Sequence, residues 1–257
     1  MHGFCPLASG SKGNCLYLGT KNTKLLIDAG LSLRSLTERL ATIDVDPHNL
    51  DAILISHEHS DHIRGVERLA HRYNLPVFAN GETAKALVAM TKRHPRFKIF
   101  STGEPFEFGD IAIHPFSIQH DTLDPVAFTF QIGAIKIGVC TDLGFVTTLV
   151  KSHLRGCDYL YLEANHEPSL VYGCARPDFY KQRVLGRQGH LSNEHCAALI
   201  EEIYHPGLKH VYLAHLSEEC NRPEVALRRV QDKLSGKALS LTIAYQDKAS
   251  APVKWGS

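Results

Sequence analysis

The chain has 257 residues, 44% hydrophobic and 21% charged, which is the balance of an ordinary soluble globular protein. Its formal net charge of +1 gives no global basic surplus of the kind that nucleic-acid-binding proteins usually carry. No apolar run approaches the roughly 20 residues of a membrane helix, and residues 1–10 do not have the pattern of a secretory signal. We therefore expect one cytoplasmic domain over residues 1–257, with no membrane partner.

Cysteine and histidine are the two informative residue types in the composition. The seven cysteines are scattered and form no C-x-x-C pair, which argues against a disulfide framework or a thiolate zinc site. We expect most of them to be small buried hydrophobes. The sixteen histidines are unusual. Because histidine is the commonest metal ligand and general acid or base, their placement decides the function.

The first half of the chain is rich in strands. Apolar and alternating runs separated by turn residues predict strands at 15–20, 24–28, 52–56, 76–79, 106–108, 111–118, 126–132 and 135–140. Helical spacing predicts helices at 31–41, 63–73 and 82–91, the first of them with Ser32 as its N-cap.

Strands and helices alternate again in the second half. Strands are predicted at 158–163, 210–215 and 239–244, and helices at 192–204 and 223–234. Ser192 caps the first of these helices, and Pro223 begins the second. Two comparable halves of this kind indicate an α/β protein in which two sheets carry helices on their outer faces.

A dense group of metal-binding side chains follows the apolar strand 52–56: His57, His59, Asp61 and His62. Residues two apart in an extended stretch point to the same side, so His57 and His59 can reach one ion. A carboxylate beside imidazoles suits zinc, manganese or iron. The alternative is that these residues cap the helix 63–73, but capping needs only one such residue.

The pattern His-x-His-x-Asp-His after a buried strand resembles the signature of the metallo-β-lactamase superfamily. The resemblance implies an αββα sandwich of two mixed sheets flanked by helices, with Asp28 orienting the ligands from behind. It implies two divalent ions and a bridging water or hydroxide. The ligands of one ion would be His57, His59, His120 and Asp142. The ligands of the other would be Asp61, His62, Asp142 and His215.

Four further motifs, at 7–14, 163–166, 183–193 and 215–221, are similar to the bacterial YycJ/WalJ family. Members of that family are described as cytoplasmic exonucleases that degrade double-stranded DNA from 5′ to 3′. The resemblance implies a metal-dependent phosphodiesterase with a DNA partner. Zinc is the expected ion, with manganese or iron as alternatives. Asp142 stands where many true lactamases carry a cysteine, which disfavours antibiotic hydrolysis.

Two residues are expected to take part directly in catalysis. The segment Gly189-His190-Leu191-Ser192 resembles the one that places a histidine near the scissile phosphate in related tRNase Z-like enzymes. We therefore expect His190 to contact the phosphate or to assist proton transfer, and Asp61 or Asp142 to orient the nucleophile. The alternative for His190 is a loop residue that fixes the start of helix 192–204.

Phosphate contacts are expected at two places. Ser11 and Asn14 lie in a glycine-rich turn whose backbone N–H groups could hold a phosphate, although a tight turn alone explains the glycines equally well. Arg183 and Arg187 lead into the His190 segment and are the other candidates. For the basic cluster at 92–98, phosphate contact is an alternative, but a solvated face is slightly favoured.

Two other functions remain open from the sequence. A lactonase or thioesterase would keep the metals and act on a small ester. A non-catalytic nucleic-acid-binding protein is disfavoured because none of the expected ligand positions is missing. The sequence decides neither between DNA, RNA and a small phosphodiester nor the oligomeric state.

Overall fold

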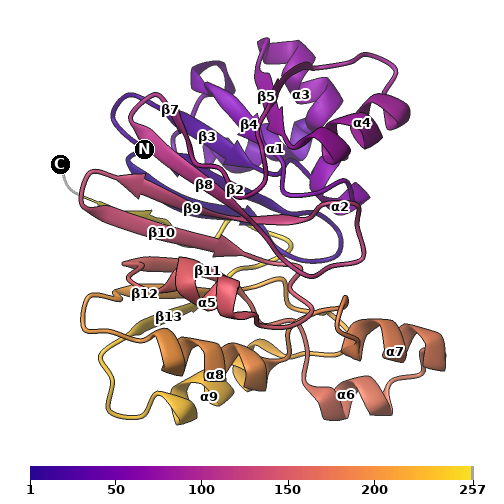
Figure 1. The fold of residues 1–257 in the computed structure, drawn as a ribbon, viewed down its shortest axis with the longest axis vertical. Coiled ribbons are helices and arrows are strands. Elements are labelled where there is room, and N and C mark those ends of the chain that lie inside the picture. The colour runs from indigo at the N-terminus through magenta and orange to yellow at the C-terminus, as the bar shows by residue number, and fades with distance from the viewer. Residues whose placement is uncertain (256–257) are drawn as a thin grey trace. The chain divides into compact units, whose positions relative to one another are not determined.

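A computed structural model describes residues 1–255 and divides them into two compact units (Figure 1). Unit 1 comprises residues 1–115, 122–126 and the C-terminal segment from Tyr245, and unit 2 comprises 116–121 and 127–244. Each unit has its own buried apolar cluster. The expectation of a single domain over the whole chain stays a prediction.

Unit 1 is built on a seven-stranded sheet with the order β14-β1-β2-β3-β4-β5-β6. Its strands are β1 (Gly3–Ala8), β2 (Cys15–Gly19), β3 (Lys24–Ile27), β4 (Ala52–Leu54), β5 (Pro76–Ala79), β6 (Arg96–Ile99) and β14 (Val253–Lys254). The strands from β3 to β6 are parallel, whereas β1 pairs antiparallel with both β2 and β14. The carboxyl ends of β3 and β4 therefore lie at one edge of the sheet.

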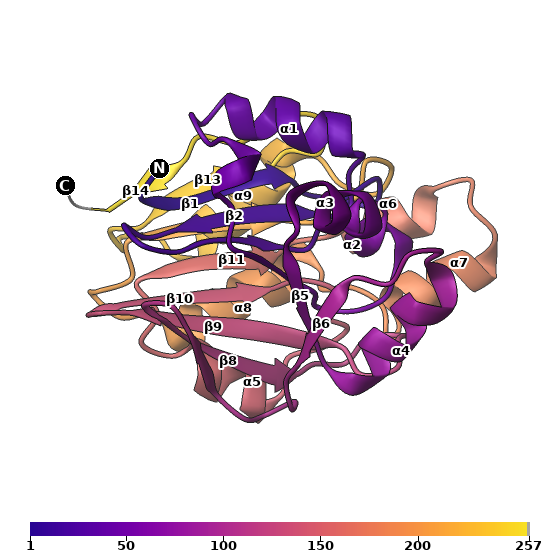
Figure 2. The ribbon, with the colours of Figure 1, turned by 90° about the horizontal axis from the view of Figure 1, so that it is seen from above.

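The helices of unit 1 are α1 (Leu33–Ala41), α2 (Ser60–Ile63), α3 (Val66–Tyr73) and α4 (Gly81–Met90), with a short 3₁₀ turn at Pro47–Asn49. The oxygen of Ser32 accepts from the backbone of Ser35, as predicted for the cap of α1. Leu36 and Leu40 of α1 are fully buried, and Figure 2 shows this helix lying over β1. Burial of such leucines contributes about 1.5–3 kcal/mol each.

The second sheet has the order β13-β12-β11-β10-β9-β8-β7. Its strands are β7 (Phe106–Phe108), β8 (Ile111–Ser117), β9 (Val126–Ile132), β10 (Ile135–Cys140), β11 (Tyr159–Glu163), β12 (His210–Ala214) and β13 (Ser240–Ile243). The hairpin β7–β8 belongs to unit 1 as far as Pro115. In unit 2, β10 to β13 are parallel, so their carboxyl ends share one edge.

Unit 2 contains the helices α5 (Thr148–Leu154), α6 (Pro168–Gly173), α7 (Asp178–Leu185), α8 (Asn193–Ile203) and α9 (Pro223–Lys233). The side chain of Ser192 caps α8, as predicted. Helices α8 and α9 lie side by side, and α9 packs on β13 (Figure 1). No helix of the described residues has the length and apolarity that crossing a membrane requires.

Some predicted elements were wrong or incomplete. The predicted helix 63–73 corresponds to α3, which begins only at Val66, because the short helix α2 ends at Ile63 and the chain turns at Arg64 and Gly65. The strands β1, β6 and β14 and the helices α5, α6 and α7 were not predicted. Strand β1 is buried throughout and so lacks the alternation of polar and apolar residues that identifies a half-buried strand. The cysteine prediction is confirmed, since all seven are free and all but Cys174 are buried.

Candidate metal centre

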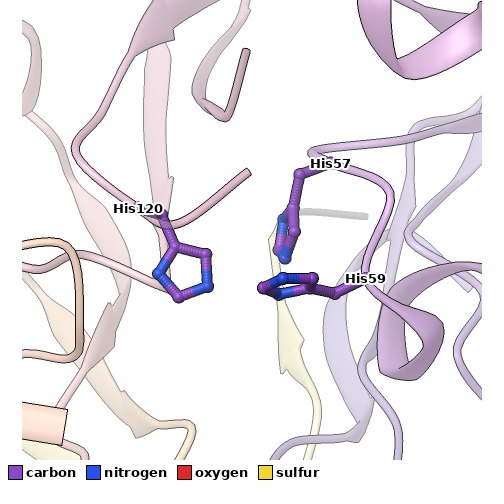
Figure 3. A group of neighbouring side chains, drawn as sticks. All are labelled: His57, His59 and His120. Carbon is purple, nitrogen blue, oxygen red and sulfur yellow. The ribbon is translucent and has the colours of Figure 1, made fainter. Parts of the chain in front are cut away.

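The histidine-rich segment of unit 1 lies directly after β4. The rings of His57 and His59 meet edge to face with their centroids 4.9 Å apart (Figure 3). The ring of His62 lies 4.0 Å from that of His57. Helix α2 begins at Ser60, with His59 as its N-cap residue, and carries Asp61 and His62. Three imidazoles and one carboxylate are therefore gathered at the carboxyl edge of the unit 1 sheet.

Backbone contacts fix the position of α2. The carbonyl oxygen of Asp61 accepts from the N–H of Asn14 at 2.7 Å, and that of His62 accepts from Ala29 at 2.8 Å. Gly30 lies against this helix so closely that an added Cβ would be 1.6 Å from the Asp61 carbonyl oxygen. Only glycine fits at this position, because any side chain would displace α2 and its two candidate ligands.

Asp28 forms hydrogen bonds to the histidine-rich segment. It adopts a left-handed backbone conformation, with φ of 59°, at the end of β3. Its carboxylate accepts from the Ser56 backbone at 2.9 Å, from the Ser56 hydroxyl at 2.8 Å and from His62 Nδ1 at 2.7 Å. The Ser56 hydroxyl also lies 2.9 Å from His57 Nδ1. Both rings therefore present Nε2 on the side away from Asp28, as the predicted orienting role requires.

Asn14 contacts the candidate ligands themselves. Its Nδ2 donates to the Asp61 carboxylate at 3.0 Å and lies 3.0 Å from His62 Nε2, while its Oδ1 accepts from the Gly10 backbone at 2.8 Å. The sequence indicated a phosphate contact for Asn14 and did not predict this one. Ser11, in the same turn, is exposed. The phosphate-binding role of both residues stays a prediction.

In unit 2 the candidate residues stand at the ends of three neighbouring parallel strands. Asp142 follows β10, Glu163 ends β11, and His215 follows β12. Asp142 and His215 adopt left-handed conformations, with φ of 58° and 55°. The amide of Asn165 donates to the His215 carbonyl oxygen at 2.7 Å and thereby supports this turn. Such conformations are uncommon for residues other than glycine and often mark functional sites.

Glu163 is the residue at the centre of this cluster. It is fully buried, and its Oε1 accepts from Nδ1 of His190 and of His215, each at 2.8 Å. Its Oε2 accepts from the backbones of Leu143 at 2.7 Å and Leu191 at 3.0 Å. Burial alone would raise the pKa of Glu163, but the charges and hydrogen bonds of His190 and His215 lower it below its usual value. Its carboxylate is saturated and orients two imidazoles.

The sequence reasoning did not assign Glu163 a role. One signal was present, because a glutamate ends the otherwise apolar run Tyr-Leu-Tyr-Leu-Glu of β11. A buried carboxylate requires partners, so this position indicated a polar cluster.

His120 and His190 complete the unit 2 cluster. His120, the third residue labelled in Figure 3, follows β8, and its Nδ1 donates to the Gly189 carbonyl oxygen at 3.1 Å. The ring of His190 lies 5.2 Å from that of His120 and 5.1 Å from that of His215. Burial lowers the pKa of His120, which favours the neutral imidazole that binds metals.

The two predicted phosphate-binding arginines already have partners within unit 2. Arg183 Nε donates to the Asp121 carboxylate at 2.6 Å. The guanidinium of Arg187 lies over the ring of Phe145, 4.2 Å from its centroid. Their role as phosphate ligands stays a prediction.

The donor groups fit a divalent metal. Unit 1 offers three imidazoles beside one carboxylate, and unit 2 offers the carboxylate of Asp142 and the imidazoles of His120 and His215. In both units Nδ1 atoms are held by hydrogen bonds, which is the usual arrangement behind histidine ligands. Imidazole and carboxylate donors suit zinc, manganese or iron.

Comparisons with known proteins confirm the resemblance and the fold class. The model of the Beta-lactamase superfamily domain matches residues 23–216. Exodeoxyribonuclease YycJ of Bacillus anthracis is 36% identical over 245 residues, which cover 95% of this chain and 93% of the relative. Exodeoxyribonuclease WalJ of Streptococcus pneumoniae serotype 2 (strain D39) is 37% identical over 254 residues, which cover 96% and 93%.

A solved structure has the same fold. The metallo-β-lactamase fold protein YhfI from Bacillus subtilis matches with a TM-score of 0.74 and 17% identity, over 96% of this chain and 99% of that one. The chain therefore belongs to the metallo-β-lactamase superfamily and, within it, to the family of the exodeoxyribonucleases YycJ and WalJ.

Proposed function

We propose that the protein is a metal-dependent exodeoxyribonuclease that hydrolyses phosphodiester bonds of DNA. The observation that carries this proposal is the set of imidazoles whose Nδ1 atoms are held by Asp28, Ser56, Gly189 and Glu163. Such support is expected for metal ligands and for a histidine that acts on substrate. The near full-length relationship to two exodeoxyribonucleases supports DNA as the substrate.

We assign two ions to the predicted ligand sets. The first ion is assigned to His57, His59, His120 and Asp142. The second is assigned to Asp61, His62, Asp142 and His215. Zinc is the first choice, with manganese or iron as alternatives. When bound, the ions supply the Lewis acidity that makes water nucleophilic at neutral pH and offsets charge on the phosphate.

His190 is assigned to the leaving oxygen of the scissile bond. Its Nδ1 is committed to Glu163, so its Nε2 is the atom that contacts the phosphate or transfers the proton. Asp61, held by Asn14, orients the attacking water.

The test is hydrolysis of end-labelled duplex DNA by the purified protein. We expect activity that is lost in metal-free protein, regained with zinc or manganese, and abolished by His59→Ala. The exposed His48→Ala is the matched control, with activity and metal content unchanged. If metal-free protein kept full activity, the scheme would be wrong. A generic lactone and a thioester assayed in parallel test the small-ester alternative, which no observation here favours.

Two further expectations belong to this proposal. The direction of digestion, 5′ to 3′, is read from the products of duplexes labelled at one end or the other. The cytoplasmic location stays a prediction, which fractionation of cells would test.

A further inference from the structure

A basic pocket lies on unit 1, outside the candidate metal ligands. It has a volume of about 440 Å³ and is formed by α3, the first residue of α1 and the turn before β6. Its lining residues are Leu33, Glu67, Arg68, His71, Arg72 and Arg93. The pocket and the histidine-rich segment belong to the same unit, because α2 and α3 are both part of unit 1 (Figure 2).

Three arginines line this pocket. Arg68 and Arg72 are one helical turn apart and share a face of α3, and Arg93 reaches the pocket from the turn. Glu67 is the only acidic residue in the lining. One of its oxygens accepts from the Arg93 backbone at 3.0 Å. The lining therefore carries a surplus of positive charge.

Several cations elsewhere in the chain have acidic partners. Arg34, Lys85, Lys151, Arg176, Arg183, Lys209, Arg229 and Lys233 each form an ion pair. Among the described residues, none of the three pocket arginines forms one. Like charges held together repel, and a bound anion would relieve that repulsion.

The basic surface continues beyond the pocket. Lys92 and Arg93 are exposed in the turn, and Arg96 and Lys98 are exposed on β6. The cluster at 92–98, for which the sequence slightly favoured a solvated face over phosphate contact, shares Arg93 with the pocket. A single small anion would occupy the pocket only, whereas a polyanion could contact the exposed cations beside it as well.

We propose that this pocket binds the phosphodiester backbone of DNA at a point away from the scissile bond. Guanidinium forks match phosphate oxygens and carry no base preference, so the contact would hold the polymer without reading its sequence. The inference rests on the proposed nuclease function and extends it, because it makes the substrate a polymer that is held at more than the cleaved bond.

The test compares R68Q/R72Q/R93Q with a matched control, R34Q/R155Q/R228Q. Both remove three exposed arginines and the same net charge. Affinity for a fluorescent duplex is measured between 50 and 200 mM salt, with His59→Ala added in each protein to prevent cleavage. We expect the pocket variant to bind at least about tenfold more weakly. The slope of log binding constant against log salt concentration should be shallower by about 2 to 3, because each lost phosphate contact removes about 0.9. The control should change little.

Two readouts separate this inference from the proposed function. Hydrolysis of bis-p-nitrophenyl phosphate by the pocket variant with an intact metal centre should equal that of the wild type, because the pocket lies outside the candidate ligands. If wild type cleaved DNA but the pocket variant and the control bound it equally, the inference alone would fail. Calorimetric binding of inorganic phosphate to the pocket with an unchanged DNA salt slope would likewise overturn it. Absence of DNA cleavage by wild type would instead overturn the proposed function.

Discussion

Glu163 and His215 are joined by a 2.8 Å hydrogen bond between Oε1 of the buried carboxylate and Nδ1 of the imidazole. The same oxygen accepts from His190 at the same distance. One carboxylate thus sets the ring orientation of a proposed ligand and of a proposed catalytic residue. The supporting contacts behind the site are therefore the first places to test.

Glu163→Gln removes the charge and replaces one acceptor oxygen by a donor. The side-chain NH2 group of the glutamine would then face either an imidazole N–H or a backbone N–H, and it cannot accept a hydrogen bond from either. We expect metal affinity to fall about 10- to 100-fold, as is typical when a partner behind a ligand is lost. Metal affinity by competition with a chelator checks this, with DNA hydrolysis as a second readout.

Glu201→Gln is the control for that change. Glu201 pairs on the surface with Lys233, so its substitution should leave metal affinity as it is. Equal metal affinity in Glu163→Gln and Glu201→Gln would show that the buried carboxylate does not support a ligand.

Asp28→Asn should lower metal affinity through the histidines of unit 1. Asp28 accepts from Ser56 and from His62 Nδ1, and the amide can replace only part of this acceptor set. We expect about a 10- to 100-fold loss of metal affinity, with the folded structure retained. Metal content and circular dichroism are measured together.

Asp46→Asn is the comparison for Asp28→Asn, because Asp46 contacts an exposed histidine, His48. A fully loaded, active Asp28→Asn protein would contradict the orienting role.

Asn221→Ala should destabilise unit 2. Asn221 Nδ2 lies 2.8 Å from the Ala164 carbonyl oxygen and 3.0 Å from that of Asn165, and its Oδ1 accepts from Asn193 at 2.9 Å. Losing the side chain leaves buried polar groups unsatisfied, at about 1–3 kcal/mol for each group. We expect a loss of about 2–4 kcal/mol in the free energy of unfolding, measured with urea.

Asn22→Ala, in an exposed turn, is the control for Asn221→Ala and should stay within about 0.5 kcal/mol of wild type. A loss no larger than that in Asn221→Ala would mean that the buried network does not stabilise the fold.

His210 should make stability depend on pH. Burial lowers its pKa to about 4, its ring packs on Tyr212, and its Nε2 has no hydrogen-bond partner among residues 1–255. Between about pH 6.5 and pH 4 the unfolded chain binds a proton that the folded chain does not. Stability is therefore complete above this window and falls as the pH is lowered through it.

His210→Gln should flatten that decline, as measured by the midpoint of thermal unfolding at several pH values. The exposed His94→Gln is the matched variant. If both variants followed the wild-type curve, the burial of His210 would not contribute to acid sensitivity.

Much of the candidate site was readable from the sequence. The segment after β4 predicts metal binding by itself, because four metal-binding side chains follow a short apolar strand. The family resemblance added Asp28, Asp142 and His215 at predicted strand ends, and the structure places them at or just after the ends of β3, β10 and β12. A strand of apolar residues followed by a turn is a local pattern, so sequence alone can locate it.

The supporting contacts were decided only by tertiary structure. Glu163 and His215 are 52 positions apart in the chain, and they meet because β11 and β12 pair in parallel in one register. Likewise, Arg93 joins Arg68 and Arg72 only because the turn before β6 packs beside α3. Hydrogen bonds and clustered charges depend on which strand ends and helices become neighbours, and that pairing is a property of the folded chain. The sequence of this protein therefore determined which residues can bind metal. The fold determined which groups form hydrogen bonds to those residues and which arginines meet in the basic pocket.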